Sequence, residues 1–335
     1  MAASDRSHGT PWQAMLRSLI DLTYGPGLSV QNERTVMSLY ERKDLYFQSG
    51  GERCAAWLYM PGGVRKPPVV VMAHGFAAER SFRLPAFAEC FAEKGMASLV
   101  FDYRNFGDST GEPRNLVDPT RHLQDWAAAI THVRTLAEVD GNRVALWGSS
   151  FSGGHVIVAA ARDQRIAAVV SQVPFVDGLA SVRVVGPKFA LRATMEGMMD
   201  LIPMITGSTP YYVPVIGKPD TFAVMNTPDA YDGYMAIVPS GSSWKNQCPA
   251  RILLKVSMYR PTRYAKKVSC PLLVVRAEKD MLMPSEAVGK MVEQTKLGEL
   301  FSLPLGHFDV YAGKSFETVA EAEAHFLAKH LGIPV

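Results

Sequence analysis

Short apolar runs alternate with amphipathic segments along most of the chain. Residues 68–73 (PVVVMA) form a continuous apolar run, typical of a strand buried on both faces. Similar runs follow at 97–103, 143–148, 167–173, 271–277 and 299–304. Between them, apolar residues recur at helical spacing. One such helix is predicted to be capped by Asp118 and opened by Pro119, and Ser315 is predicted to cap the last. This alternation predicts an α/β fold, a mostly parallel sheet with helices on both faces.

Residues 174–267 interrupt the alternation. This block is rich in Pro, Met and Tyr and holds seven of the sixteen methionines. We interpret it as a cap inserted between two segments of an α/β core, 36–173 and 268–335. An N-terminal helical extension, 1–35, precedes the core. The cap methionines either line an apolar ligand site or form the cap's own core.

Four cap residues are the candidate contacts with a substrate: Met195, Met199, Tyr211 and Tyr212. The alternative for the two tyrosines is packing against the domain below, where the aromatic side chains of an insertion usually lie.

Residues 43–51 (KDLYFQSGG) admit two interpretations. The letters resemble an engineered protease-cleavage linker. However, Leu45 and Phe47 alternate with polar residues and lead through Ser49-Gly50-Gly51 into the apolar AAWLYM. That pattern favours a native β-hairpin equally well.

Composition narrows the class of protein. The chain has 335 residues and a net charge of +3 without a block of Lys or Arg, which argues against nucleic acid as a partner. No apolar run approaches the roughly 18 residues needed to span a bilayer. The N-terminus lacks the pattern of a secretory signal, so a cytoplasmic location is expected. The four cysteines are scattered, which disfavours a zinc or redox site.

Three serines stand in the glycine-rich stretch 146–155 (LWGSSFSGGH). A nucleophile at a sharp strand-to-helix turn needs small residues two positions before and two after it. Ser149 fails this requirement because Trp147 precedes it by two. Ser150 and Ser152 both satisfy it, but the apolar run stops at Trp147, so the turn is expected to centre on Ser150.

A serine nucleophile needs a histidine base oriented by an acid. His307 lies on the loop after the last predicted strand, which opens at the edge of the sheet where Ser150 emerges. The acid is expected after the preceding strand, where Asp280 is favoured over Glu278. Asp309 is interpreted as a structural or capping acid.

These residues lie in stretches that resemble the α/β-hydrolase superfamily. The stretches are MAHGF (72–76), FDYRNFGDSTG (101–111), GSSFSGG (148–154), AEKD (277–280) and GHFDVY (306–311). The similarity is greatest to the branch of bacterial esterases and X-prolyl dipeptidyl peptidase-like proteins, near the fungal polyketide transferases.

The resemblance implies an eight-stranded α/β-hydrolase core with an inserted cap and a triad of Ser150, Asp280 and His307. It also implies an oxyanion hole formed by the backbone N–H groups of Phe76 and Phe151. The predicted activity is hydrolysis of a carboxylic ester or thioester through an acyl-serine, with no metal or organic cofactor. Transfer of an acyl group to an alcohol or amine is the nearest alternative, and a ligand receptor is a third. The expected partner is a small-molecule acyl substrate, and a homodimer stays open.

Overall fold

The computed structural model describes residues 39–334. The helix predicted for residues 1–35 lies outside this range, as do residues 36–38 and 335 of the predicted core segments. None of the helices in the described range is both long and apolar enough to cross a membrane.

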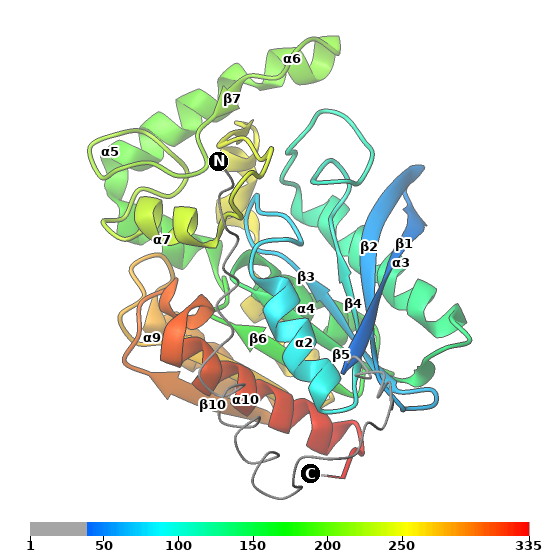
Figure 1. The fold of residues 1–335 in the computed structure, drawn as a ribbon. Coiled ribbons are helices and arrows are strands. Elements are labelled where there is room, and N and C mark those ends of the chain that lie inside the picture. The colour runs from blue at the N-terminus through cyan, green and yellow to red at the C-terminus, as the bar shows by residue number, and fades with distance from the viewer. Residues whose placement is uncertain (1–38, 335) are drawn as a thin grey trace, which may run out of the picture. The chain divides into compact units, whose positions relative to one another are not determined.

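An eight-stranded sheet forms the centre of the described chain (Figure 1). Its strands are β1 (Tyr40–Ser49), β2 (Glu52–Pro61), β3 (Pro68–Ala73), β4 (Ala97–Phe101), β5 (Asp140–Ser149), β6 (Ala168–Gln172), β9 (Leu272–Ala277) and β10 (Gly298–Leu303). They lie in the order β1-β2-β4-β3-β5-β6-β9-β10. The pairs that involve β2 are antiparallel, and every other neighbouring pair is parallel. The mostly parallel eight-stranded sheet expected from the sequence is therefore confirmed.

Strands β1 and β2 form the hairpin that residues 43–51 allowed. The two strands pair along ten residues each, and Gly50 and Gly51 make the turn with φ of 54° and 85°. Such positive φ values favour glycine because it has no Cβ. Phe47 packs edge-on against Phe101 with ring centroids 5.5 Å apart, and the Ser49 hydroxyl donates to the Asp125 carboxylate at 2.6 Å. These buried contacts make the segment an integral part of the sheet.

Helices cover both faces of the sheet. On one face α2 (Leu84–Glu93) packs against α10 (Gly313–His330), and on the other α3 (Pro119–Thr135) packs against α4 (Phe151–Arg162). Successive residues of a strand point to opposite faces, as β5 illustrates. Trp147 meets Phe87 of α2, whereas Gly148 lies against α4. A further helix, α9 (Ser285–Glu293), packs beside β9 and β10.

The two predicted helix caps have different outcomes. Asp118 caps α3, because its carboxylate accepts hydrogen bonds from the N–H groups of Thr120 and Arg121. The prediction for Ser315 was wrong. Helix α10 begins two residues earlier, at Gly313, after Ala312 in an extended conformation. Ser315 therefore lies inside the first turn.

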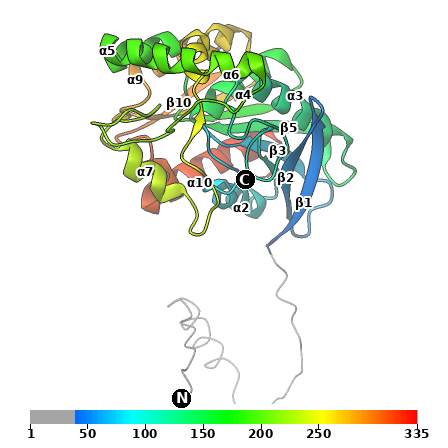
Figure 2. The same cartoon turned by 90° about the horizontal axis from the view of Figure 1, so that it is seen from above.

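The segment interpreted from the sequence as a cap, 174–267, supplies the elements between β6 and β9 (Figure 2). Its elements are α5 (Gly178–Met199), α6 (Leu201–Thr206), β7 (Tyr212–Val213), α7 (Ala230–Ile237), β8 (Cys248–Pro249), α8 (Ile252–Lys255), and the 3-10 helices η1 (Val256–Met258) and η2 (Pro261–Lys267). A buried ion pair joins α5 to α8. The Asp200 carboxylate accepts from the guanidinium of Arg251 at 2.6 and 3.0 Å. The last element, η2, packs against α4 of the core.

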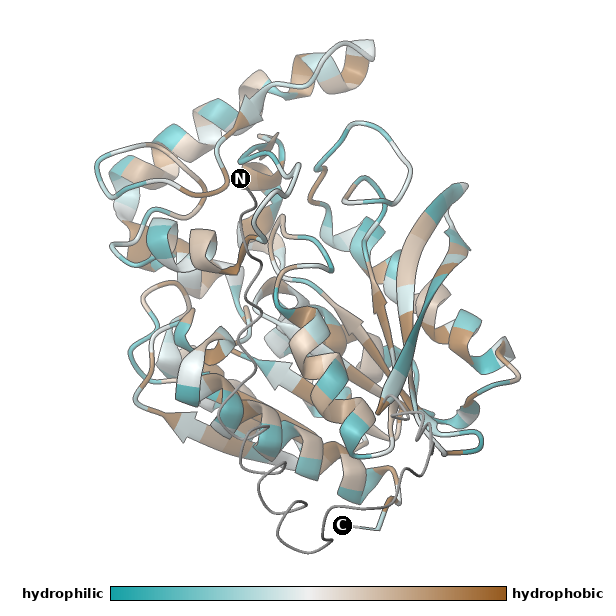
Figure 3. Cartoon of the chain, viewed as in Figure 1, coloured by the Kyte–Doolittle hydropathy of each residue, from teal (hydrophilic) through white to brown (hydrophobic). Residues whose placement is uncertain are grey.

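Burial explains why the central strands read as continuous apolar runs. Every residue of β3 and β4 is buried, since helices or neighbouring loops cover both of their faces. Figure 3 shows the hydrophobic colour concentrated on the strands at the centre of the sheet. Burial of each large apolar side chain there contributes roughly 1.5–3 kcal/mol to the stability of the sheet that carries the loops at its edge.

Candidate active site

Ser150 lies at the sharp turn between β5 and α4. Its φ of 57° and ψ of −119° place it in a strained conformation that non-glycine residues rarely adopt. The neighbours two positions away are small for a steric reason. A Cβ on Gly148 would lie 2.4 Å from the carbonyl oxygen of Ser152. The turn predicted from the sequence is thus centred on Ser150.

The three serines of this stretch have different partners. Ser150 Oγ is 3.1 Å from His307 Nε2. Ser149 points elsewhere: its hydroxyl is hydrogen-bonded to the hydroxyl of Tyr311 and accepts from the side-chain amide of Gln172 at 2.9 Å.

Ser152 is hydrogen-bonded to the Tyr103 hydroxyl at 2.8 Å. The indole N–H of Trp126 also donates to that hydroxyl. Both Ser149 and Ser152 are fully buried, whereas Ser150 retains 7% exposure. Only Ser150 of the three is placed beside a base.

His307 and Asp280 complete the arrangement expected from the sequence. His307 follows β10, and its Nδ1 is 2.6 Å from a carboxylate oxygen of Asp280, which follows β9. A carboxylate can only accept, so Nδ1 carries the proton and Nε2 is left to accept from Ser150. The other carboxylate oxygen of Asp280 accepts from the N–H groups of Leu282 and Met283 at 2.8 Å each. These bonds fix the orientation of the acid.

The other acids near this loop are engaged elsewhere. Glu278 accepts a hydrogen bond from Ser302 at 2.8 Å in an exposed position. Asp309 accepts from the N–H of Gly306 at 2.7 Å. Asp309 thereby closes the loop that carries His307, which is the structural role expected for it.

Hydrogen bonds to the carbonyls of the preceding residues fix the peptide groups that carry the N–H of Phe76 and the N–H of Phe151. In a trans peptide the C=O and the following N–H point in opposite directions. The carbonyl of Gly75 accepts from His74 Nδ1 at 3.1 Å, and the carbonyl of Ser150 accepts from the N–H of Phe175 at 2.9 Å. The N–H of Phe151 also starts α4, where the helix provides no acceptor.

Two cap residues that the sequence analysis did not single out hold the loop that carries Phe76. The hydroxyl of Tyr234 donates to the carbonyl of Phe76 at 3.0 Å, and the indole N–H of Trp244 donates to the carbonyl of Ala77 at 2.8 Å. Tyr234 is buried on α7 and Trp244 follows that helix. Their contacts span more than 150 residues, so local sequence patterns hold no signal for them.

Three buried histidines, His74, His122 and His155, lie close to the turn at Ser150. His74 packs edge-on against Tyr103, and the ring of His122 stacks on Tyr103 at a centroid distance of 4.0 Å. His122 Nδ1 is 3.3 Å from His155 Nε2, and His155 Nδ1 is 2.6 Å from the Tyr259 hydroxyl. Burial lowers the pKa of His74 to about 4 and that of His155 to about 3, and holds the pKa of His122 well below its usual value. All three are neutral at pH 7.

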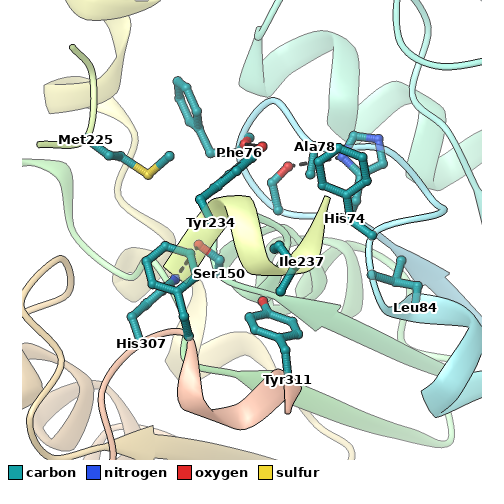
Figure 4. A pocket seen from close by; sticks show the side chains of 13 residues that line it. His74, Phe76, Ala78, Leu84, Ser150, Met225, Tyr234, Ile237, His307 and Tyr311 are labelled. Carbon is teal, nitrogen blue, oxygen red and sulfur yellow. Dashed lines mark hydrogen bonds between the residues drawn. The ribbon is translucent and has the colours of Figure 1, made fainter. Parts of the chain in front are cut away.

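Two cavities meet at Ser150. The larger has a volume of about 380 Å³ and a mostly apolar lining. The smaller, drawn in Figure 4, has about 20 Å³, enough for about one water molecule. Ser150 and His307 face each other at its wall, and both Phe76 and Met225 border the two cavities. Other residues of the larger cavity are Phe151, Phe175, Val182, Phe189, Ala193 and Met283.

The four cap residues named as candidate substrate contacts do not line either cavity. Met195 and Met199 lie on the outer side of α5 and are 61% and 60% exposed. The Tyr211 hydroxyl donates to Glu196 on the surface, and the Tyr212 hydroxyl donates to the carbonyl of Arg114. The composition of the segment 174–267 indicated that it contributes to the lining of a cavity, which it does. Which side chains of α5 point into the cavity depends on packing, and composition holds no information about packing.

Within residues 39–334, no group of three or more His, Cys, Asp or Glu side chains is arranged to hold a metal ion. The side chain of His307 is within hydrogen-bond distance of Ser150 and is itself bound to Asp280, an arrangement that suits acid–base and nucleophilic chemistry.

The fold and this site define the chain as an α/β hydrolase. The family profile described as "Serine aminopeptidase, S33" matches residues 65–300, and the chain belongs to that family. The quorum-quenching protein AidA of Acinetobacter baumannii is 42% identical over 286 residues, which cover 85% of this chain and 94% of AidA.

Two fungal proteins are more distant relatives. A thiohydrolase of Eupenicillium brefeldianum is 27% identical over 300 residues, covering 86% of this chain and 94% of its own length. The polyketide transferase grgF of Penicillium is 26% identical over 298 residues, covering 88% and 98%. A crystal structure of the α/β hydrolase GrgF from Penicillium matches with a TM-score of 0.74 at 26% identity, over 87% of this chain and 99% of that one. The protein is thus an enzyme of the α/β-hydrolase family, and its relatives include proteins named thiohydrolase and polyketide transferase.

Proposed function

We propose that this protein is a serine hydrolase that cleaves a carboxylic ester or thioester through an acyl-serine intermediate. The observation that carries the proposal is the alignment of Ser150, His307 and Asp280 at the junction of the two cavities. The hydroxyl of Ser150 lies 3.1 Å from the base, within the reach required for proton transfer.

The first half-reaction forms the acyl-serine. His307 Nε2 takes the proton of Ser150 as Oγ attacks the acyl carbonyl carbon, and Asp280 stabilises the imidazolium. The N–H groups of Phe76 and Phe151 stabilise the oxyanion, each worth roughly 10²–10³ in rate. The carbonyl re-forms as the bond to the leaving oxygen or sulfur breaks, and His307 returns the proton to that atom.

The second half-reaction releases the acid. A water molecule in the small cavity beside His307 loses a proton to Nε2 and attacks the acyl carbonyl carbon. The bond between that carbon and Ser150 Oγ then breaks, and Oγ takes the proton back from His307 as the acid leaves. The volume of about 20 Å³ suits one water and excludes a large nucleophile. The small cavity therefore supports water as the acceptor of the acyl group.

The larger cavity supports an apolar acyl group as the part of the substrate that is bound. Its volume of about 380 Å³ lies within the range of small-molecule sites, and most of its lining is aliphatic or aromatic. The relatives named a thiohydrolase and a quorum-quenching protein agree with cleavage of an ester-type bond in a diffusible small molecule. The family description names aminopeptidases, but a shared fold does not fix the substrate.

The test is a kinetic panel with paired serine variants. Purified protein is assayed on p-nitrophenyl esters of increasing chain length, matching acyl thioesters and an acylated lactone. We expect Ser150→Ala to lower kcat/KM on the order of 10⁴-fold or more while the melting temperature stays within a few degrees. Ser152→Ala, which removes a hydroxyl two positions away, is the matched control and should retain most of the activity. Equal losses in the two variants, or turnover by Ser150→Ala, would refute the proposal.

Acyl transfer to an alcohol or amine is the second candidate, favoured by the relative named a polyketide transferase. The acyl-serine is common to both reactions, so only its acceptor differs. Competition between water and an added alcohol or amine, followed by mass spectrometry of the products, distinguishes them. Free acid as the main product at high acceptor concentration supports hydrolysis. A pure receptor would show no burst of leaving group in the first turnover.

A further inference from the structure

An apolar stripe runs along the outer side of α5 and α6. It consists of Leu191, Met195, Met198, Ile202 and Ile205, which are between 55% and 79% exposed. We call these five residues the outer stripe. Figures 1 and 2 both show α5 and α6 following each other end to end along the outside of the cap. Monomeric proteins rarely leave so many large apolar side chains exposed together.

The spacing of the outer stripe is that of a helix–helix contact. Its members follow each other at intervals of four, three, four and three residues. This alternation is the seam by which two helices pack side by side with interlocking side chains. Asp200, between the helices, keeps a right-handed helical conformation, so the seam passes from α5 to α6 with little interruption.

The opposite side of the same helices is already packed. Ala193, Gly197 and Asp200 are buried and face the rest of the cap, with Gly197 close to Leu254. A helix that is apolar on both sides is normally covered on both. In the described chain, only the inner side of α5 is covered.

The charges around the outer stripe permit a close approach by an apolar partner. The stripe itself has no ionisable residue. Arg192 beside it forms an ion pair with Glu196 at 3.4 Å, which leaves Lys188 as the charge at one end. A partner helix can therefore lie along the stripe without burying an unpaired charge, which would be costly.

We propose that a second copy of this chain covers the outer stripe, so that the protein is a homodimer joined through α5 and α6. An antiparallel arrangement about a two-fold axis pairs the stripe with itself, as closed dimers require. The five residues of the stripe, and Met199 beside them, are each more than half exposed. Burial of a large apolar side chain contributes roughly 1.5–3 kcal/mol, so pairing the stripe with itself buries enough apolar surface on each partner to form the core of a stable interface.

The dimer has a consequence for the larger cavity. The inner side of α5 supplies Phe189, Ala193 and Thr194 to its wall. A partner helix on the outer side holds this wall in place over Ser150. This consequence adds to the proposed function, and the proposal of a dimer does not depend on it.

The test is the mass of the full-length chain in solution. Sedimentation velocity over a wide range of concentrations should give twice the mass of the chain. Met195→Glu places a charge in the middle of the stripe and should weaken the dimer about thirtyfold or more, so that the monomer dominates. Leu297→Glu is the matched control, because Leu297 is 51% exposed and lies between α9 and β10. It should leave the dimer unchanged.

Three outcomes would overturn the proposal. The first is a wild-type chain that stays monomeric throughout the concentration range, which would leave residues 1–38 or another molecule as the cover. The second is a dimer that Met195→Glu does not weaken, since its interface then lies elsewhere. The third is a monomer that sediments with vesicles of phosphatidylglycerol and is released by Met195→Glu, which would assign the stripe to a lipid surface.

Discussion

Glu323 of α10 provides a test of how a buried carboxyl group beside the strand of the nucleophile affects the stability of the fold. Its carboxyl group is fully buried and accepts a hydrogen bond from the indole N–H of Trp147 at 2.8 Å. Trp147 belongs to β5, the strand that ends directly before Ser150. Within residues 39–334 the second carboxyl oxygen of Glu323 has no hydrogen-bond partner. Burial of the charged form raises the pKa of Glu323 to about 8 from an ordinary 4.5.

This pKa shift sets the sign and the size of the pH dependence of the free energy of unfolding. In the folded protein Glu323 keeps its proton up to pH 8, whereas in the unfolded chain it loses the proton near pH 4.5. The unfolded state therefore binds fewer protons between these values, and stability falls as the pH rises. Each pKa unit corresponds to about 1.4 kcal/mol, so the loss approaches about 5 kcal/mol by pH 8. For a chain of this size that is roughly 10 °C in Tm.

The perturbation is Glu323→Gln, which keeps the acceptor for Trp147 and cannot ionise. At pH 5 the variant is expected to be less stable than the wild type by about 1–3 kcal/mol, because its amide adds an unpaired buried donor. As the pH rises to 8 the difference should shrink and change sign. The assay is urea unfolding at half-unit pH steps. Glu321→Gln is the matched control, since Glu321 lies on the same helix with a side chain 66% exposed. A difference between wild type and Glu323→Gln that is constant from pH 5 to pH 8 would show that Glu323 is ionised in the fold.

Three further predictions follow from the same structure. Tyr234→Phe removes the hydrogen bond to the Phe76 carbonyl; it should lower kcat about fivefold, from a bond worth about 1 kcal/mol, with KM little changed in steady-state assays. Burial lowers the pKa of His155, so the stability that the neutral side chain contributes is present above pH 6.5 and is lost as the pH falls. Replacement of His155 by Gln should therefore reduce the loss of stability below pH 6.5. Thermal melts of the wild type and the variant at pH 7 and pH 4.5 measure this difference. Ala190→Phe fills part of the larger cavity and should shift the chain-length optimum of ester hydrolysis to shorter acyl groups, with about fourfold lost for each methylene excluded.

The arrangement of Ser150, His307 and Asp280 was predictable because each of these residues lies on the turn or loop that follows a strand. The position of Ser150 is fixed by two constraints that the sequence displays: the end of the apolar run at Trp147 and the small residues around the turn. His307 and Asp280 follow strands that are parallel neighbours, so their loops open at the same edge. The hydrogen bonds that link the three residues are consistent with those positions.

The cap was not predictable at the level of single residues. Its periodicity is obscured because α5 is apolar on both sides, so Met195 could not be assigned to the inner or the outer side. The contacts of Tyr234 and Trp244 with the loop at Phe76 depend on how the cap lies over the core. The hydroxyl of Ser149 illustrates the same limit, since its partner Tyr311 is 162 residues away. Local patterns locate elements, whereas contacts between distant segments decide which side chains meet.

The central claim is that Ser150 is the nucleophile, and covalent labelling tests it most directly. A fluorophosphonate probe is incubated with the full-length protein, and the labelled peptide is identified by mass spectrometry. We predict one probe per chain, attached to Ser150, and no labelling of the Ser150→Ala variant. A label on Ser152 or on another residue, or a wild-type protein that does not react while it hydrolyses esters, would contradict the account.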